Sequence, residues 1–147
     1  MPRRDTRLES VGAEFLVLGE LLIRGIPAHK TYTNTPGYDV VAVDPEKNSV
    51  ARISVKSRWN TDATGFIIKN FDCDFVVIVK LNRGTTKDTQ NVRPPQFFVL
   101  PTRVVEELPS SNWGRIDFPR IPDFKGYADR WDLIRTFLSS SKGRPER

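Results

Sequence analysis

In the first third of the chain, the spacing of hydrophobic residues changes once, from that of a helix to that of strands. Between residues 9 and 24, apolar side chains recur every three or four positions, which predicts an amphipathic helix. Ser10 is suited to cap its start, and Gly25 stands where a left-handed residue ends a helix at little cost. The predicted apolar stripe consists of Val11, Phe15, Leu18, Leu21 and Leu22.

Short apolar runs follow this helix and are typical of buried strands. Residues 26–33 fit a short edge strand, and the Asn-Thr-Pro-Gly sequence that ends at Gly37 predicts a turn. The main predicted strands cover residues 38–43, 50–57, 75–81 and 96–100. The first two are joined by a hairpin loop at 44–48, while the pattern breaks at 61–65 and a polar loop that we expect to be mobile covers 82–91.

The C-terminal third is less regular. A short helix is predicted through residue 108, residues 109–126 show no clear period, and residues 128–138 are again helical, with an apolar side. That side consists of Trp131, Ile134 and Leu138. The order of helix, strands and further helices predicts one α/β (α+β) domain over residues 1–147, with a central mixed β-sheet flanked by helices. Residues 1–8 are expected to form a basic arm and residues 139–147 a flexible tail.

Composition narrows the class of protein. The formal net charge of +5 and the sequence pI of about 9.6 favour a polyanionic partner such as nucleic acid. A single cysteine, Cys73, excludes a disulfide framework and is expected to be a small buried side chain, and the lone His29 is read as a surface residue. The N-terminus has no apolar secretory segment and no stretch is long enough to span a membrane, so we expect a cytoplasmic protein.

The candidate chemistry centres on Asp39, Lys56 and Glu14. A carboxylate at the start of an apolar strand is costly to desolvate unless a partner compensates its charge. The hairpin brings Asp39 and Lys56 toward the same end, and Glu14 joins them if the first helix packs across the sheet. Each residue also has a structural reading: Glu14 as a first-turn helix glutamate, Asp39 as part of a turn, and Lys56 as a solvated lysine.

Two carboxylates and a lysine suit phosphodiester hydrolysis. The carboxylates can hold a hard cation such as Mg²⁺, which lowers the pKa of a bound water and neutralises developing charge. The lysine can orient that water or stabilise the transition state. We therefore predict that Glu14, Asp39 and Lys56 converge on one accessible patch, with Asp39 against Lys56 in the metal-free protein.

Taken in order, these segments resemble the PD-(D/E)XK nuclease superfamily, which includes restriction endonucleases and Holliday-junction resolvases. The matching segments are Gly12-Ala13-Glu14 and the helix end at Gly25, Gly37-Tyr38-Asp39-Val40-Val41, Ile53-Ser54-Val55-Lys56-Ser57, and the later strands at 74–79 and 96–101.

The resemblance implies a restriction-endonuclease-like core, DNA cleavage, dependence on Mg²⁺ or Mn²⁺, and metal ligation by Asp39, Glu14 and the Val55 carbonyl. It places Lys56 and Ser54 in the catalytic motif. Ser54 is a departure, because the family usually has Glu or Gln there, and a serine hydroxyl is a weak, neutral ligand.

Basic and aromatic residues surround this motif. Arg52, Arg58 and Lys69 are expected to contact DNA phosphates, and Trp59 either stacks on a base or covers one end of the core. The leading hypothesis is a metal-dependent DNA endonuclease. The alternatives are a catalytically inactive member of the same fold that binds DNA, and a regulatory scaffold that binds protein; a homodimer or a protein partner fits any of them.

Overall fold

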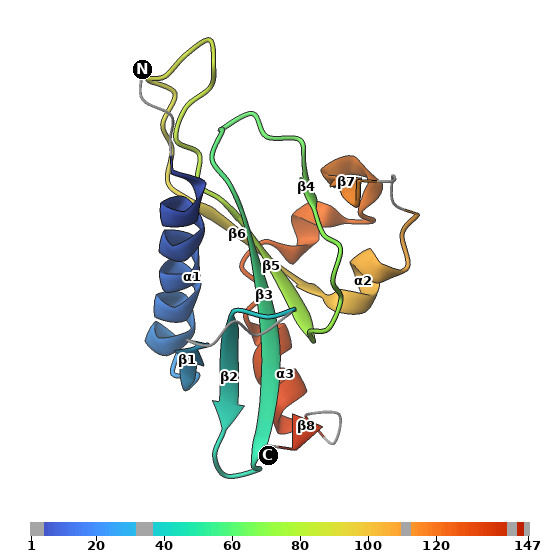
Figure 1. Cartoon of the computed structure of the whole chain (residues 1–147). Helices are drawn as coiled ribbons and strands as arrows, with labels where there is room; N and C mark the ends of the chain where they lie inside the picture. Colours follow the sequence, from blue (N-terminus) through green and yellow to red (C-terminus); the bar gives the residue numbers. More distant parts are fainter. Residues whose placement is uncertain (1–4, 32–36, 110–112, 141–143, 146–147) are drawn as a thin grey trace.

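The protein is described from a computed structural model over residues 5–31, 37–109, 113–140 and 144–145 (Figure 1). The helices are α1 (Thr6–Ile23), α2 (Thr102–Glu106) and α3 (Asp132–Ser139), with short 3₁₀ turns η1 (Phe118–Arg120) and η2 (Phe124–Tyr127). The strands are β1 (Ala28–Lys30), β2 (Val40–Asp44), β3 (Ser49–Arg58), β4 (Gly65–Ile67), β5 (Phe75–Lys80), β6 (Gln96–Pro101), β7 (Arg115–Asp117) and β8 (Arg144–Pro145).

A mixed sheet with the order β1-β2-β3-β5-β6 forms the centre of the fold. β1, β2 and β3 are joined antiparallel, β3 and β5 run parallel, and β5 and β6 are again antiparallel. This arrangement confirms the predicted mixed sheet flanked by helices. β3 is its longest strand, and it also pairs with β8 near the C-terminal end of the chain.

The two faces of the sheet are covered by different parts of the chain. α1 and α3 cover one face, where Ala13, Val17 and Leu21 meet Trp131 and Ile134 in the larger core. β4, β7, α2 and the 3₁₀ turns lie on the other side and cover the second core above β5 and β6. None of the described helices has the length and apolar character of a membrane span. The faces therefore differ: one is covered by α1 and α3, and the other by shorter helices, 3₁₀ turns and a two-stranded sheet.

Helix α1 begins earlier than predicted and buries another face. Asp5, not Ser10, is the N-cap, and its carboxylate accepts a hydrogen bond from the backbone N–H of Arg7 at 2.9 Å. The helix ends as predicted, since Gly25 has φ +77° and the N–H groups of Gly25 and Ile26 bond to the carbonyls of Leu22 and Leu21.

The predicted apolar stripe of α1 was largely wrong. Only Leu21 of that set is fully buried, and Leu18 is partly buried; the true inner face is Ala13, Val17 and Leu21. Val11, Phe15 and Leu22 are exposed. The helix is apolar on two sides, so its period alone does not say which side meets the sheet.

Other differences are confined to short elements and ends. β4 and β7 pair with each other in segments that had no strand pattern, while the predicted apolar side of the last helix, with Trp131 and Ile134, is buried. Thr6–Leu8 belong to α1 instead of a flexible arm, Ser139 belongs to α3, and β8 lies in the predicted tail. The arm at 1–4, the turn residues 34–36 and the strand residues 32–33 lie outside the described residues.

Candidate nuclease site

Asp39 lies where β2 begins, and its carboxylate is directed at β3. Its Oδ2 accepts a hydrogen bond from the backbone N–H of Val55 at 2.8 Å. The regular β2–β3 ladder starts at Val40 opposite Ile53, so the side chain of Asp39 takes the place of the next strand partner. A carboxylate that accepts a backbone N–H has part of its desolvation cost offset. This backbone hydrogen bond explains how a charged Asp39 can stand at the start of an apolar strand.

The carbonyl of Val55 lies at the same edge. In a strand, the N–H and C=O of one residue point toward the same neighbouring strand. The backbone N–H and C=O of Ile53 point toward β2, since this carbonyl accepts a hydrogen bond from the N–H of Asp39 at 2.8 Å. The backbone groups of Val55, two residues further along β3, point in the same direction. The Val55 carbonyl and the Asp39 carboxylate are therefore two oxygen donors beside each other at the edge where β2 leaves β3.

Gly37 fixes how the chain enters this site. Its φ is +93°, and a Cβ at this position would lie 2.8 Å from the carbonyl oxygen of Asp72. Only glycine tolerates both that backbone conformation and that close approach. The Gly37-Tyr38-Asp39 segment is thus held against the 70–72 turn, which precedes β5.

Ser54 and Lys56 lie on the face of β3 opposite Ile53 and Val55, as their alternation predicted. Across the parallel β3–β5 pair, Ser54 is level with Val76 and Lys56 with Ile78, both of which belong to the second core. Ser54 is only 4% exposed, whereas Lys56 is half-buried. The structure therefore brings Asp39, Ser54, Val55 and Lys56 to one part of the hairpin.

Lys56 also lies near Cys73, which is buried as predicted. Burial raises the pKa of the Cys73 thiol, while its hydrogen bond with Thr102 and the positive charge of Lys56 act in the opposite direction. The cysteine thus stays protonated at neutral pH, and this side of Lys56 carries no competing negative charge from it.

The predicted contact between Asp39 and Lys56 was wrong. Both residues are described, yet no ion pair within 4.0 Å joins them, because the carboxylate is turned toward the Val55 N–H. A backbone donor fixed in the strand holds the carboxylate without the entropy cost of ordering a long lysine side chain. Lys56 is left without an ion-pair partner among the described residues.

Glu14 is held by a residue that the sequence did not single out. It forms an ion pair with Lys30 of β1, and both side chains are largely buried, with 18% and 8% exposure. Lys30 stands opposite Val40 in the β1–β2 pair, one residue beyond Asp39, and the N–H of Thr31 bonds to the Asp39 carbonyl at 3.0 Å. Glu14 therefore lies toward the same end of β2 as Asp39, but on the side of α1 and bonded to its own lysine.

The four predicted DNA-contacting residues fall into two groups. Arg52 and Arg58 share the face of β3 that carries Lys56, and the guanidinium of Arg52 lies 5.4 Å from the centre of the Tyr38 ring. Trp59 packs against the larger core, which agrees with its structural reading, and Lys69 is exposed beyond β4. The alternation of β3 thus produces a row of three cations, Arg52, Lys56 and Arg58.

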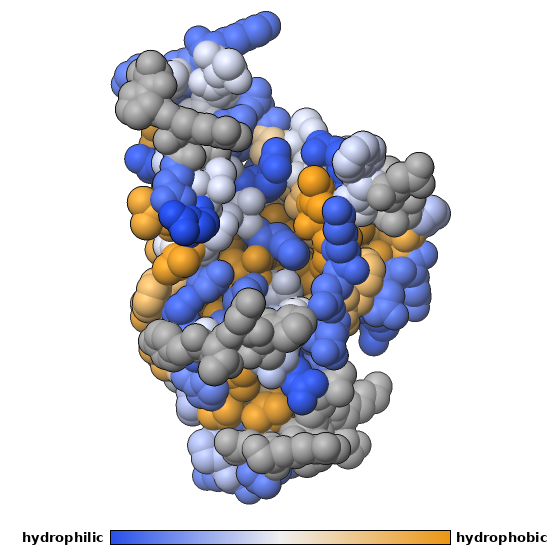
Figure 2. Space-filling view, in the orientation of Figure 1, coloured by the Kyte–Doolittle hydropathy of each residue, from blue (hydrophilic) through white to orange (hydrophobic). Residues whose placement is uncertain are grey.

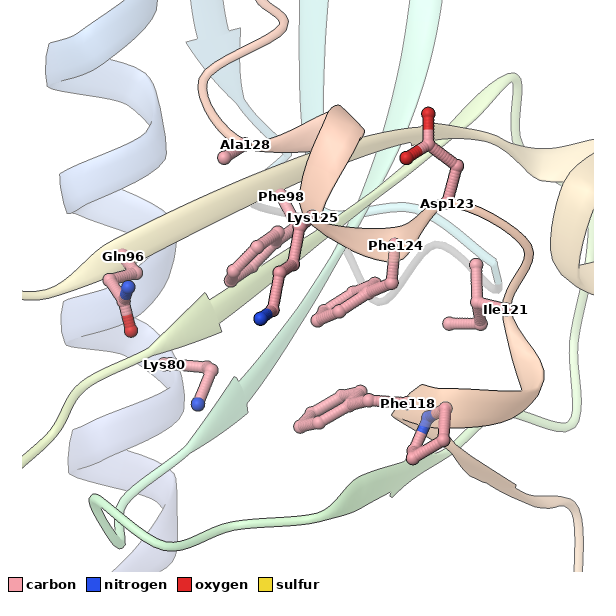
Figure 3. Close-up of a pocket in the computed structure, with 10 residues that line it drawn as sticks. Lys80, Gln96, Phe98, Phe118, Ile121, Asp123, Phe124, Lys125 and Ala128 are labelled. Carbon is pink, nitrogen blue, oxygen red and sulfur yellow. The ribbon is translucent and has the colours of Figure 1, made fainter.

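β5 extends this row toward an aromatic pocket. Lys80 is level with Arg58, and its Nζ lies 5.8 Å from the centre of the Phe118 ring. The pocket, of about 720 Å³, lies against the stacked rings of Phe98, Phe124 and Phe118, with Lys80 and Lys125 on the same side (Figure 3).

The Nε of Arg58 is buried and has no hydrogen-bond acceptor in the part of the chain that the structure describes. Arg58 and Lys80 are directly opposite each other, and an anion such as a phosphate would relieve the repulsion between these two cations. Lys80 is the residue of this group that the sequence reasoning missed, because its position opposite Arg58 depends on the parallel β3–β5 pairing.

The oxygen donors at the β2–β3 edge can be compared with what a divalent cation requires. Mg²⁺ keeps several waters and takes oxygen ligands from the protein, of which Asp39 offers one carboxylate and Val55 one carbonyl. Among the described residues, no group of three or more acidic, histidine or cysteine side chains is placed to hold a metal ion, and Glu14 is paired with Lys30. The donor set fits a weakly held hard cation, with Ser54 adding no charge.

A comparison with solved structures finds a similar fold. The chain is similar to a bacterial homing endonuclease, I-Ssp6803I, with a TM-score of 0.65 and 22% sequence identity. The match covers 95% of this chain and 98% of that chain, so it includes both layers of the fold. No family model matches the sequence, and no curated protein matches it. At this identity the comparison shows the fold, and the chemistry has to be argued from the residues.

Proposed function

We propose that this protein is a metal-dependent DNA endonuclease of the PD-(D/E)XK type, which hydrolyses phosphodiester bonds. The observation that carries the proposal is the Asp39 carboxylate held at 2.8 Å by the N–H of Val55, between Ser54 and Lys56. This contact joins Asp39 to the strand that carries Ser54, Val55 and Lys56, four of the residues on which the resemblance rests, and so supports the proposal. The fold shared with a homing endonuclease and the net charge of +5 support the same conclusion.

Each residue has a distinct part in this proposal. Asp39 and the Val55 carbonyl would hold Mg²⁺ or Mn²⁺, which supplies an activated water and charge neutralisation when bound. Lys56, which no carboxylate of the described residues neutralises, is free to orient the attacking water or to stabilise the negative charge of the transition state. Glu14 lies toward the same end of β2, where Lys30 balances its charge. Arg52, Arg58 and Lys69 hold the DNA by its phosphates.

The second candidate function is DNA binding without cleavage. Ser54 favours it, because the serine brings no negative charge to the position where the superfamily usually has a carboxylate. The ion pair between Glu14 and Lys30 favours it as well, because it engages the other carboxylate. Both candidates use the same row of cations, so DNA affinity alone does not separate them.

The decisive experiment is cleavage of supercoiled plasmid and of single-stranded DNA with Mg²⁺, with Mn²⁺ and with EDTA. We expect cleavage that requires millimolar metal and is better with Mn²⁺, which tolerates an imperfect ligand set. Lys56→Ala should lower the rate by about a hundredfold or more, while Lys87→Ala, an exposed lysine in the 82–91 loop, should not. A parent protein that binds DNA but is inert with every metal would replace this proposal by the second candidate.

A further inference from the structure

The outward side of α1 is a largely exposed apolar surface, which within the described part of the chain is contacted by Lys30, whose Nζ lies 4.9 Å from the centre of the Phe15 ring. Most of the exposed large hydrophobic side chains among the described residues belong to this one helix. They are Leu8, Val11, Phe15, Leu16, Leu22 and Ile23, and we call them the outer face of α1. Leu8 is 73% and Ile23 80% exposed, so the face is open at both ends. Hydrophobic side chains gather along this edge of the molecule (Figure 2). Contiguous apolar surface of this kind is typical of a contact with another molecule.

This face carries no charge that would oppose a like surface. From Val11 to Ile23, every exposed residue is apolar or glycine. The glutamates in this stretch are paired within the chain, Glu14 with Lys30 and Glu20 with Arg24 at 3.3 Å. Two copies of the helix can therefore approach each other without like-charge repulsion. A lipid surface fits less well, because interfacial helices usually flank their apolar face with several lysines and arginines.

Two glycines lie on the same side of α1, and no contact in the described part of the chain requires a glycine at either position. Gly12 and Gly19 lie in the helix interior, where glycine is less favourable than alanine, and a Cβ at either position would meet nothing within 4 Å. Neither has a positive φ that would require glycine. What glycine offers at an outer helix surface is a close approach by another backbone. The exposed apolar face thus contains two positions that are shaped for a neighbouring helix.

Part of this face is symmetric about its centre between Phe15 and Leu16, while Val11 and Leu22 are matched by Glu20 and Glu9. Gly12 and Gly19 are equally far from that centre, and so are Leu8 and Ile23. When two such helices lie antiparallel about a two-fold axis between Phe15 and Leu16, Gly12 of one copy meets Gly19 of the other on either side of the axis, and Leu8 meets Ile23 at each end. A surface that complements itself under a two-fold rotation is what an isologous dimer requires.

We propose that the protein forms a symmetric homodimer in which α1 packs antiparallel against α1 of a second copy. Phe15 and Leu16 lie at the axis, and Gly12 and Gly19 set the close spacing of the helices. The Asp39 site lies between β2 and β3 and includes none of these four residues, so the dimer can be tested without measuring cleavage and does not depend on the proposed function.

Sedimentation velocity of the full chain over a range of concentrations tests the dimer. We expect the parent to associate, and Leu16→Asp and Leu8→Asp each to shift it to the monomer with an unchanged far-UV spectrum. Ile67→Asp, which places the same charge on an exposed apolar residue of β4, should leave association as in the parent. Gly12→Ala should raise the thermal midpoint of the monomer yet weaken association by about tenfold or more, which a merely structural glycine would not do.

Disulfide trapping tests the antiparallel direction, and the native Cys73 is buried and gives little background. A mixture of Leu8→Cys and Ile23→Cys proteins should cross-link to each other, while Leu8→Cys alone should not. Efficient cross-linking of Leu8→Cys with itself would overturn the antiparallel arrangement. A parent that remains monomeric at its highest soluble concentration, or a monomer that pellets with phosphatidylcholine vesicles, would overturn the dimer.

Discussion

Two carboxylates lie toward the same end of β2 and are held in different ways. Asp39 accepts a hydrogen bond from the backbone of β3 through its Oδ2, whereas Glu14 is bound to a buried lysine on the α1 side of the sheet. The first arrangement positions a carboxylate at an edge beside Val55 and Lys56. The second neutralises a carboxylate inside a layer of the fold. The difference teaches that one acidic residue of the predicted pair is presented for chemistry, while the other also contributes to the packing of α1 on β1.

Cleavage by two matched variants is the strongest test of this comparison. Asp39→Asn keeps an oxygen that can accept the Val55 N–H but removes the charge, so we expect folding to persist and cleavage to fall by about a hundredfold or more. Glu14→Gln should lower cleavage less, because Lys30 already neutralises that carboxylate. Plasmid cleavage under single-turnover conditions measures both, with Asp44→Asn in the β2–β3 loop as the control. Equal losses in the two variants would mean that Glu14 and Asp39 act as one ligand pair.

The comparison also predicts that loss of the Glu14–Lys30 ion pair lowers the stability of the fold. Lys30→Met removes the partner of Glu14 and leaves a largely buried carboxylate, which should lower the free energy of unfolding by about 3–5 kcal/mol. Urea denaturation measures this loss, and Lys30→Met combined with Glu14→Gln should recover much of it, because neither charge then remains. If Lys30→Met is no less stable than Asp44→Asn, the ion pair does not hold α1.

Ser54→Glu extends the comparison of Asp39 with Glu14, because it adds a third carboxylate. This carboxylate would be on the face of β3 that carries Lys56. It should strengthen Mn²⁺ binding, measured by calorimetry, because a hard cation prefers charged oxygen ligands. The same change should lower the thermal midpoint, since position 54 is almost fully buried. Ser57→Glu, on the same strand but facing the other way, is the matched control. Unchanged metal binding in Ser54→Glu would show that position 54 does not face the cation.

The smallest expected effect concerns the cations beside the two carboxylates. Replacing Arg52, Arg58 and Lys69 together by alanine should flatten the dependence of log affinity for duplex DNA on log salt, by about 0.9 for each DNA phosphate that the variant no longer neutralises. Lys80→Ala added to this variant should flatten it further, since Lys80 is level with Arg58. Fluorescence anisotropy over a salt series gives the slope, and the Lys87→Ala slope should equal that of the parent.

The hairpin that carries Asp39 and Lys56 could be predicted because its signals are local. Apolar runs defined β2 and β3, and the alternation on β3 correctly separated Ile53 and Val55 from Ser54 and Lys56. The inner face of α1 could not be predicted, because Leu8 to Ile23 is apolar on both sides and the small Ala13, which fits against the sheet, carries a weak hydrophobic signal.

Contacts between segments that are distant in the sequence could not be predicted, for a related reason. Lys30 is the last residue of the short edge strand β1, and nothing in the sequence distinguishes it from other lysines until β1 is placed beside β2 and against α1. Lys80 acquires its role only through the register of β3 with β5. The bond from Val55 to Asp39 depends on where β2 leaves the ladder, which is decided by Gly37 packing against Asp72.

The amide of Val55 offers a spectroscopic view of this site. Most strand N–H groups of the sheet donate to backbone carbonyls, but this one donates to an ionisable side chain. Its proton resonance should therefore follow the charge on Asp39, and its exchange with solvent should quicken when that carboxylate is removed or drawn away. A single cross-peak in a nitrogen–proton spectrum can thus report protonation of Asp39, the arrival of a cation and the opening of the strand edge, without any need for turnover.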